Sequence, residues 1–255
     1  MNDQHTSAIE PNTLLITGAS RGIGAATALA AARQGRDIVL NYVRDEPAVR
    51  AVAQSVQALG RQTTIIQADI GEEADIRRMF DEIETRIGPL LGLINNAGIT
   101  GPIGPFVNTT HATLEHVFRI NVLGAMQCAR EALANFKRHE TKGVIVNVSS
   151  SAARLGSANE FVHYAASKAA IETFTIGLAK EVAAEGIRVC GLAPGSTLTD
   201  IHAMAGEPGR PARVAPLIPM KRLAEPAEIA EAIVWLASPA ASYVTGTTLL
   251  CAGGL

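Results

Sequence analysis

The sequence predicts a single α/β domain in which helices cover both faces of a parallel sheet. Short runs that are apolar almost throughout alternate with helical stretches of ten or more residues, which is typical of a doubly wound fold. Of the 255 residues, 47% are hydrophobic and 18% are charged, so the chain can bury a substantial core. No linker, repeat or low-complexity block divides residues 13–255, and residues 1–12 are predicted to form a flexible tail.

The expected elements follow one another in regular order. Strands are expected at residues 13–17, 37–42, 63–69, 91–95, 143–149, 187–193 and near 247–251. Helices are expected at residues 25–34, 47–59, 72–86, 162–185 and 227–236. In the third of these helices, apolar residues recur on one face at Ile76, Met79, Phe80 and Ile83.

The alternation stops between residues 195 and 219, where glycine and proline interrupt any long element. Long irregular segments in compact domains often serve as lids or binding loops. We therefore expect a lid-like insertion near residues 195–219, the alternative being a mobile insertion without a role. His202, Met204 and Leu217 would give it a mixed polar and apolar lining.

Composition and charge exclude several classes of function. A formal net charge of −2 provides no basic field for nucleic acid or anionic lipid. The first dozen residues lack the apolar core of a secretory signal, and no apolar run reaches the ~20 residues that span a bilayer. Cys128, Cys190 and Cys251 form no CxxC pair, and the six histidines show no metal-ligand spacing. We expect a cytoplasmic protein without a metal site.

The stretch TGASRGIG, residues 17–24, lies between the first expected strand and helix. Gly18, Gly22 and Gly24 permit a tight turn and close backbone approach, and the following helix offers unpaired N–H groups to a pyrophosphate. The stretch therefore predicts a dinucleotide-binding turn, the alternative being a glycine-rich connection without a ligand.

The end of the second strand indicates which nicotinamide cofactor is bound. An acidic residue there would hydrogen-bond the adenosine ribose and repel a 2′-phosphate, but this chain has Asn41 followed by Tyr42. Arg21 lies in the glycine turn and Arg44 just beyond the second strand, and both could bind the phosphate, which favours NADP(H) over NAD(H). Alternatively, the arginines are solvated or pair with the acidic residues 45 and 46.

Tyr164 and Lys168 in FVHYAASK are four residues apart, so on a helix they share one face. A free phenol has a pKa near ~10, and a nearby ammonium lowers it by favouring phenolate. The pair could therefore act as a proton donor with its tuning charge. Taken alone, such a pair is more often a packed tyrosine beside a solvated lysine.

Several motifs in order give the chain its resemblance to a known family. TGASRGIG is followed by NNAG at residues 95–98, Asn121, NVSS at 147–150, the Tyr164 and Lys168 pair, and the turn at Pro194 and Gly195. This set resembles the short-chain dehydrogenase/reductase family, including members similar to 3-oxoacyl-carrier-protein reductase and glucose dehydrogenase. The resemblance implies a Rossmann fold with a seven-stranded parallel sheet. It also implies reversible hydride transfer between a nicotinamide cofactor and a carbonyl or alcohol.

The resemblance also implies roles for individual residues. Tyr164 would be the general acid/base, Lys168 would lower its pKa and hold the nicotinamide ribose, and Asn121 would hold a water beside the lysine. Ser150 would polarise the substrate oxygen, because the match of NVSS fixes its register through Asn147, with Ser151 as the alternative. The implied cofactor-binding residues are Gly18, Ser20, Arg21, Gly22, Ile23, Gly24, Asn41, Tyr42, Arg44, Asp69, Ile70, Asn96, Ala97, Gly98, Tyr164, Lys168, Pro194, Gly195, Thr197 and Thr199.

Two departures from the family pattern concern packing and assembly. Cys190 stands where many members have asparagine, and Ala252 where many have aspartate. The resemblance implies a homodimer or homotetramer that pairs helices near residues 115–136 and 162–185. Two further functions stay open: reduction of a carrier-protein-bound ketoacyl group, with Lys137 and Arg138 as docking residues, and a non-catalytic NADP-binding sensor or scaffold.

Overall fold

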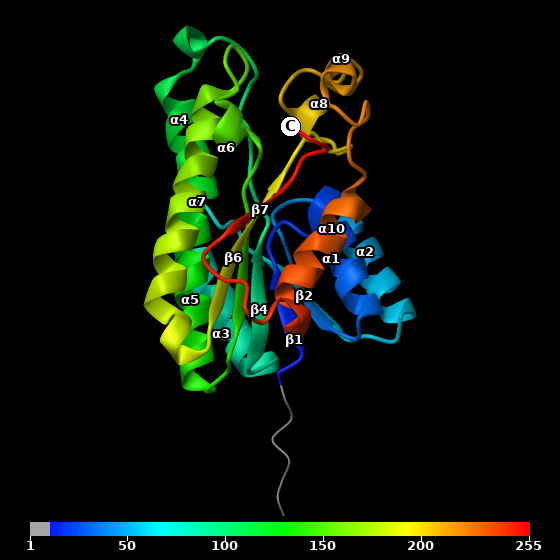
Figure 1. Ribbon diagram of the computed structural model, residues 1–255. Coiled ribbons are helices and arrows are strands. Elements are labelled where there is room, and N and C mark those ends of the chain that lie inside the picture. Colours follow the sequence, from blue (N-terminus) through cyan, green and yellow to red (C-terminus); the bar gives the residue numbers. More distant parts are fainter. Residues whose placement is uncertain (1–10) are drawn as a thin grey trace, which may run out of the picture.

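The computed structural model describes residues 11–255 and contains one sheet of seven parallel strands (Figure 1). The strands are β1 (Thr13–Ile16), β2 (Asp37–Tyr42), β3 (Thr63–Gln67), β4 (Leu90–Asn95), β5 (Val144–Val148), β6 (Arg188–Pro194) and β7 (Thr248–Cys251). Their spatial order is β3-β2-β1-β4-β5-β6-β7, and every neighbouring pair is parallel. The predicted doubly wound, seven-stranded Rossmann fold is confirmed.

The strands are apolar throughout because both faces of the sheet are covered. In β1, Leu14 and Ile16 contribute to one hydrophobic core and Leu15 to the other. The same alternation sends Val146 of β5 to the first core and Ile145 to the second. Since neighbouring side chains on a strand point to opposite faces, each strand supplies both cores at once.

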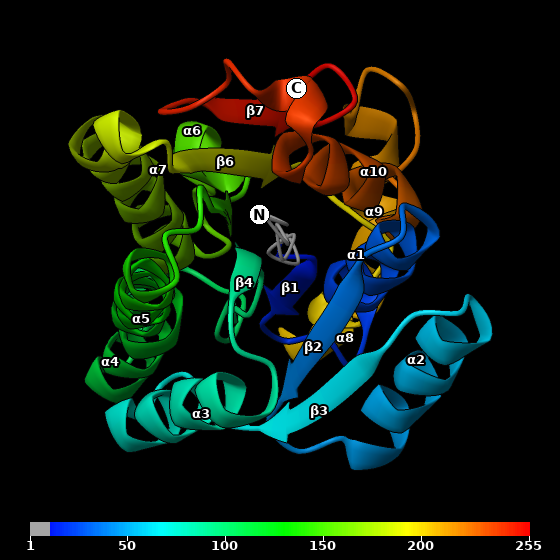
Figure 2. The same cartoon turned by 90° about the horizontal axis from the view of Figure 1, so that it is seen from below.

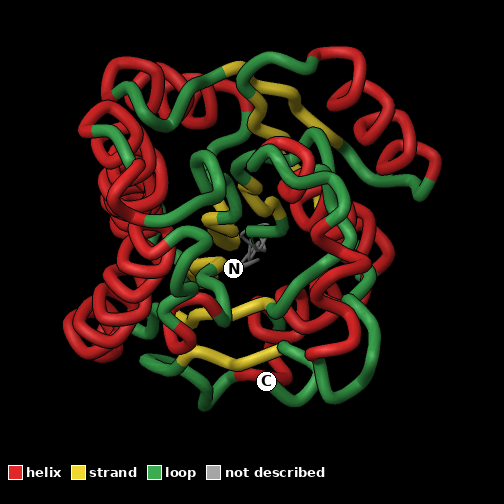
Figure 3. Tube along the Cα trace, turned by 90° about the horizontal axis from the view of Figure 1, so that it is seen from above, coloured by secondary structure: helices red, strands yellow, loops and turns green. Residues whose placement is uncertain are grey.

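Three long helices pack on each face of the sheet (Figure 2). The first face carries α1 (Gly22–Arg33), α2 (Glu46–Ala58) and α10 (Pro226–Ala237). The second carries α3 (Glu73–Arg86), α5 (Ala125–Arg138) and α7 (Val162–Val182). Seen from above, the helices enclose the strands from both sides (Figure 3). This arrangement leaves the carboxyl edge of the sheet open for the loops that carry the motifs.

Shorter elements complete the chain. They are α4 (His111–Phe118), a π-helical turn η2 (Arg119–Gly124), α6 (Ala152–Leu155), α8 (Ile201–Met204) and α9 (Arg210–Val214), with 3₁₀ turns at Phe106–Asn108, Ala183–Glu185, Ala215–Leu217 and Pro239–Ala241. Helix α1 begins three residues before its predicted start at residue 25, because Gly22 and Gly24 of the glycine turn already belong to it. Within residues 11–255, no helix is both long and apolar enough to cross a membrane.

The predicted insertion near residues 195–219 contains the short helices α8 and α9, which lie above the sheet (Figure 1). Its two ends meet, since Thr197 and Ala224 form a parallel bridge. The Leu198 N–H donates to the Ala224 carbonyl at 2.9 Å, and the Ala224 N–H donates to the Ser196 carbonyl at 3.0 Å. The segment is thus an excursion that leaves and rejoins the fold at one point.

The predicted tail of residues 1–12 falls mostly outside the described residues. Asn12, however, is held by the domain, because its side-chain amide donates to the Gly35 carbonyl at 2.8 Å and its Oδ1 accepts from Arg36 at 2.9 Å. The ordered domain therefore includes at least this last residue of the predicted tail.

Candidate active site

The glycine turn follows β1 at the point where the strand order reverses between β1 and β4. Gly18 has a φ of 62°, and a Cβ on it would lie 3.0 Å from the Cα of Ala97. Asn96 bridges the two loops, donating from Nδ2 to the Thr17 carbonyl at 2.9 Å and to the Gly18 carbonyl at 3.1 Å. The turn and the NNAG stretch are therefore packed together at the topological switch point, where doubly wound folds bind nucleotides.

The N-terminus of α1 is left open for an anion. Arg21 at the N-cap makes no side-chain capping bond, and the first turn contains no acidic residue. By contrast, Asp45 caps α2 and Thr110 caps α4 through side-chain oxygens. The first N–H groups of α1, together with the helix dipole, suit the pyrophosphate of a dinucleotide.

Asn41 plays a structural part at the end of β2. Its side chain is buried, with Oδ1 accepting from the Gly18 N–H at 3.2 Å and Nδ2 donating to the Ala68 carbonyl at 2.9 Å. Tyr42 is also buried. Both residues, predicted to bind the cofactor, thus have side chains turned into the protein, and Asn41 fixes the glycine turn to the neighbouring strand.

The two predicted phosphate-binding arginines differ in their surroundings. Arg21 pairs with Asp45 at 3.0 Å and approaches Asp200 at 3.8 Å. Arg44 is exposed and forms no ion pair with any residue of the described part of the chain. Arg44 is therefore the more available cation for a 2′-phosphate, while Arg21 would first have to leave its carboxylates.

The remaining cofactor residues line the same edge of the sheet. The carboxylate of Asp69 accepts from the Gly71 N–H at 2.8 Å, and Ile70 beside it is buried. Beyond β6, Thr199 reaches the glycine turn, with its Cγ2 3.1 Å from the position of a Cβ on Gly22. The set that the structure brings to this edge also includes Ser20, Ile23, Gly24, Gly98, Pro194, Gly195 and Thr197.

Asn121 lies within the π-helical turn η2 and is buried. Its Nδ2 donates to the Ile99 carbonyl at 2.8 Å and to the Ser167 hydroxyl at 3.0 Å, and its Oδ1 accepts from the Ile99 N–H at 2.9 Å. π-Helical turns widen a helix at functional sites. Here the turn aims the asparagine at the loop after β4 and at α7.

Lys168 lies beside this asparagine. A Cβ on Gly98 would lie 3.2 Å from both Asn121 Oδ1 and Lys168 Nζ, so the glycine leaves the space that these two groups share. The Lys168 ammonium donates to the Val148 carbonyl at 2.8 Å. Burial lowers the pKa of Lys168 to about 8, so the side chain is still mostly charged at neutral pH.

Tyr164 is buried, and the Lys168 Nζ lies 5.8 Å from the centroid of its ring. Burial raises the pKa of Tyr164, while a hydrogen bond from Ser150 and the charge of Arg210 act in the opposite direction. The predicted lowering of this pKa by Lys168 therefore does not hold for the protein by itself. Desolvation of the phenolate outweighs the combined effect of the Ser150 hydroxyl and the Arg210 cation.

The three consecutive serines have different environments. Ser149 donates to Glu172 at 3.0 Å and Ser151 is buried, whereas Ser150 is the serine whose hydroxyl lowers the pKa of Tyr164. Ser150 also accepts from the Ala152 N–H at 3.1 Å, which fixes its rotamer. The geometry thus favours Ser150 over Ser151 as the partner of the substrate oxygen.

The serine assignment predicts unequal effects of two matched substitutions. Ser150→Ala should lower kcat for carbonyl reduction by about 10²–10³-fold, because a hydrogen-bond donor to the developing oxyanion is lost. Ser151→Ala should change kcat by no more than a few-fold. Initial rates with a saturating carbonyl substrate decide between them, and the reverse order of effects would assign the role to Ser151.

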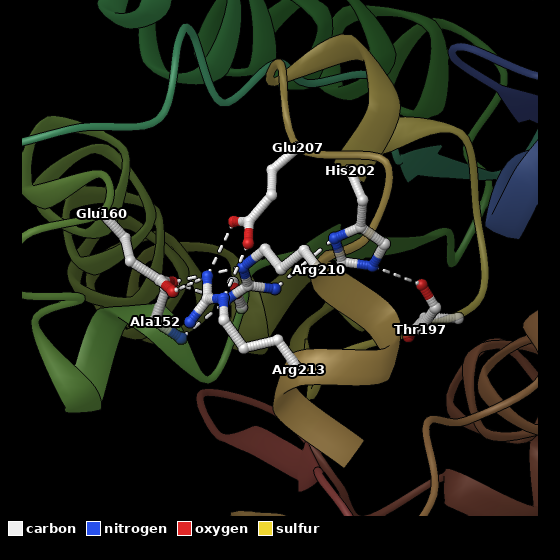
Figure 4. A network of polar contacts seen from close by, with 8 residues as sticks. Ala152, Glu160, Thr197, His202, Glu207, Arg210 and Arg213 are labelled. Atoms are coloured by element: carbon white, nitrogen blue, oxygen red, sulfur yellow. Dashed lines mark hydrogen bonds and ion pairs between the residues drawn. The ribbon is translucent and has the colours of Figure 1, made fainter.

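Sequence reasoning missed Arg210. The motifs gave no sign of it, because an arginine among glycines and prolines in an irregular segment looks like a solvated side chain. Only the fold brings α9 against the start of α7, where Arg210 pairs with Glu160 (Figure 4). Among residues 11–255, no group of three or more His, Cys, Asp or Glu side chains could hold a metal ion.

Comparison with known proteins places the chain in a family. Residues 18–255 match a family model described as Enoyl-(Acyl carrier protein) reductase. An uncharacterized oxidoreductase, YgfF, from Escherichia coli (strain K12) is 46% identical over 242 residues, covering 94% of this chain and 98% of the relative.

Two solved structures share the fold over almost their whole length. A blue fluorescent protein from a metagenomic library, in complex with NADPH, is 32% identical with a TM-score of 0.88, covering 96% of this chain and 98% of the other. A 3-ketoacyl-(acyl-carrier-protein) reductase from Brucella melitensis, complexed with NADH, is 30% identical with a TM-score of 0.87, covering 97% and 99%. Similarity of this extent, together with the motifs at the carboxyl edge of the sheet, shows that the chain belongs to the short-chain dehydrogenase/reductase family.

Proposed function

We propose that this oxidoreductase transfers hydride reversibly between NADP(H) and a small carbonyl or alcohol substrate, with Tyr164 as the general acid/base. The observation that carries the proposal is the buried side chain of Tyr164, whose pKa the Ser150 hydroxyl lowers and whose ring centroid lies 5.8 Å from the Lys168 ammonium. A buried phenol with a donor on one side and a cation on the other is arranged to exchange a proton with a substrate oxygen.

The residues at the carboxyl edge fit a dinucleotide. The uncapped N-terminus of α1 suits its pyrophosphate, and the glycines leave room for close backbone approach. Lys168, beside Gly98, would hold the nicotinamide ribose. When bound, the cofactor supplies or accepts the hydride.

The chain's own residues manage the proton and the oxygen. During reduction, Tyr164 gives its hydroxyl proton to the substrate oxygen, and Ser150 stabilises the charge that develops there. During alcohol oxidation, the phenolate of Tyr164 removes the same proton. Asn121 and Ser167 lie behind Lys168 and fix the start of α7, since Ser167 donates to the Tyr164 carbonyl at 2.7 Å.

NADP(H) is the preferred cofactor in this proposal because Arg44 is exposed and unpaired while no carboxylate ends β2. A charge-assisted hydrogen bond to the 2′-phosphate contributes about 1.5–3 kcal/mol. At about 1.4 kcal/mol per tenfold, this corresponds to a preference on the order of 10- to 100-fold over NAD(H). The neighbour complexed with NADPH supports this choice, and the one complexed with NADH makes a direct comparison necessary.

Carrier-protein substrates lose their predicted docking site. Lys137 pairs with Glu185 at 3.3 Å, and Arg138 pairs with Glu84 at 3.0 Å. Both lie at the end of α5, immediately before β5 begins, whereas Tyr164 lies beyond the end of β5. The two cations are therefore in surface ion pairs at the opposite edge of the sheet from Tyr164, and they do not support a docking patch beside it.

Assembly and location complete the proposal. Phe118, Leu123 and Ile176 are exposed apolar side chains on α4, η2 and α7, which supports pairing of these helices in a homodimer or homotetramer. Cys128, Cys190 and Cys251 are all unpaired, as is usual in the reducing cytoplasm.

A panel of aldehydes, ketones and alcohols tests the function. With NADPH, the absorbance of the reduced cofactor should fall in the presence of at least one carbonyl class, and NADH should be used at least about 10-fold less efficiently. Arg44→Ala should raise the KM for NADPH by about 10-fold and leave that for NADH unchanged. Arg33→Ala, at the opposite end of α1, is the matched control and should change neither.

Two outcomes would contradict the proposal. NADPH binding without turnover across the whole panel would favour a sensor or scaffold. A strong preference for NADH would overturn the role given to Arg44.

A further inference from the structure

Glu160, just before α7, connects the segment 195–219 to the start of this helix, which carries Tyr164 and Lys168. Its Oε2 accepts from Arg210 Nη2 at 2.6 Å and Nε at 3.2 Å, and its Oε1 accepts from Arg213 Nη2 at 2.6 Å (Figure 4). The Arg210 and Glu160 side chains are only 11% and 19% exposed. This pair has two-point geometry away from bulk water, unlike the surface pairs that contribute little.

The guanidinium of Arg210 is connected to Tyr164 through the ring of Phe161. The Arg210 Cζ lies 5.1 Å from the centroid of the Phe161 ring. That ring meets Tyr164 edge to face, with centroids 5.5 Å apart and planes at 90°. A cation over an aromatic face is held by the ring quadrupole, so Phe161 locates Arg210 relative to Tyr164.

Backbone contacts hold the segment in the same place. The Ile103 N–H donates to the Ala205 carbonyl at 3.0 Å, and the Gly104 N–H donates to the Glu160 carbonyl at 2.8 Å. The loop after β4 is therefore joined both to the segment 195–219 and to the start of α7, and its Ile103 packs against the cluster that contains Tyr164.

We propose that Arg210 is a positioning residue for proton transfer: its ion pair with Glu160 closes the segment 195–219 over Tyr164 and sets a fixed cation beside the phenol. The inference rests on the proposed function, in which Tyr164 exchanges the proton. Because an arginine does not titrate in the working range, the charge is present whenever the segment is closed. The Arg210–Glu160 ion pair thus both holds the segment 195–219 closed and lowers the pKa of Tyr164.

The charges around Tyr164 give the sign of the effect. Lys168 lies on α7 together with Tyr164. Arg210 belongs to the segment 195–219, where it pairs with Glu160. His202 Nδ1 lies 3.4 Å from Arg210 Nη1, and burial is the main cause that lowers the pKa of His202, so it is neutral where the tyrosine titrates.

The outer carboxylates and the second arginine do not titrate in this range either. Burial opposes the ionisation of Glu160, but hydrogen bonds from Arg210 and Arg213 hold its pKa below the usual value. Glu207 pairs with Arg213 at 2.7 Å. Arg210, which lies over the Phe161 ring that packs on Tyr164, is the group of this cluster whose charge acts on Tyr164. Its cation favours phenolate, so its loss must raise the pKa of Tyr164.

The test compares Arg210→Gln with the wild type by titrating Tyr164. The chain has three tyrosines, and subtracting the near-ultraviolet titration of Tyr164→Phe isolates this one. Arg210→Gln should move the midpoint upward on the order of half a pH unit. The pH profile of kcat for alcohol oxidation should move upward by the same amount, since phenolate is the required form.

Two further variants separate charge from closure. Arg210→Gln should also raise the substrate KM, because the segment 195–219 is no longer held closed. Arg210→Lys keeps the cation but not the two-point contact, so it should reverse part of the pH shift but not the rise in KM. Arg213→Gln removes the half-exposed partner of the same Glu160 and should leave the Tyr164 midpoint unchanged.

Three results would decide against the proposal. An unchanged midpoint in Arg210→Gln, or an equal shift in Arg213→Gln, overturns the placement of the cation. An Arg210→Lys variant with wild-type KM overturns the role in closure. An inactive wild type would refute the proposed function. Because the titration of Tyr164 needs no substrate, it would still measure the effect of the Arg210 cation on the pKa of Tyr164.

Discussion

Tyr164→Phe should lower kcat for carbonyl reduction by about 10²–10⁴-fold, because the substrate oxygen loses its proton donor. The affinity for NADPH should stay close to that of the wild type, since the phenyl ring keeps the packing with Phe161. Steady-state rates and fluorescence titration of NADPH measure the two effects separately. A loss of rate without a loss of binding identifies the hydroxyl as the reacting group.

The control for this substitution is Tyr243→Phe. Tyr243 is fully exposed and lies far along the chain from the site, so removal of its hydroxyl should leave kcat unchanged. A Tyr164→Phe variant that retains most of the wild-type rate would refute the acid/base mechanism. It would also remove the catalytic roles given to Ser150 and Arg210, although the contact of Arg210 with Phe161 would remain.

Gly24→Ala should disrupt the cofactor site more severely than any other one-carbon change in the glycine turn. A Cβ at this position would lie 2.4 Å from the Gly18 carbonyl oxygen and 2.6 Å from Asn96 Nδ2. These two atoms are themselves hydrogen-bonded across the switch point at 3.1 Å. The added methyl group would therefore force apart the contact that joins the glycine turn to the loop after β4.

Overpacking of this kind costs about 3 kcal/mol. NADPH binding requires the glycine turn in its native conformation, which the methyl group disfavours. A cost of about 3 kcal/mol for restoring that conformation corresponds to an affinity for NADPH about 100-fold weaker. Calorimetric titration with NADPH and thermal unfolding of the free protein measure the two consequences.

Gly177→Ala is the matched control. Gly177 lies in α7 with no heavy atom within 4 Å of the position of its Cβ, so the alanine should stabilise the helix by up to about 1 kcal/mol and leave NADPH binding unchanged. Wild-type affinity in Gly24→Ala would mean that the glycine turn does not contact the cofactor closely.

The fold could be predicted from the sequence because its local signals agree with one another. The inner strands are apolar on both faces, as in β5, where Val146 and Ile145 enter different cores. This pattern is stable only between two layers of helices, so periodicity and topology point to the same architecture.

The site divides into a part that sequence reveals and a part that it does not. Tyr164, Lys168, Asn121 and Ser150 were predictable because their spacing is fixed by single elements and by the family resemblance. Asn41 was predicted to contact the cofactor, but its amide is used to hold the turn, which only the partners Gly18 and Ala68 reveal.

The predictions that fail depend on three-dimensional neighbours. Whether Lys137 is a free cation is decided by Glu185, 48 positions away in the sequence and 3.3 Å away in space. The direction of the Tyr164 pKa shift depends on burial, which cannot be read from the sequence FVHYAASK around it. Arg210 acts through Phe161, and no sequence pattern predicts its ion pair with Glu160 or its contact with the Phe161 ring.

The bridge between Thr197 and Ala224 has a consequence for how such an enzyme can evolve. Residues 198–223 begin and end at one bridge, so their length and sequence can change at little cost in loop-closure entropy. None of the four residues proposed for catalysis, Asn121, Ser150, Tyr164 and Lys168, belongs to this excursion. Selection can therefore replace this segment, and with it the cation of Arg210, while Asn121, Ser150, Tyr164 and Lys168 keep their places in the fold.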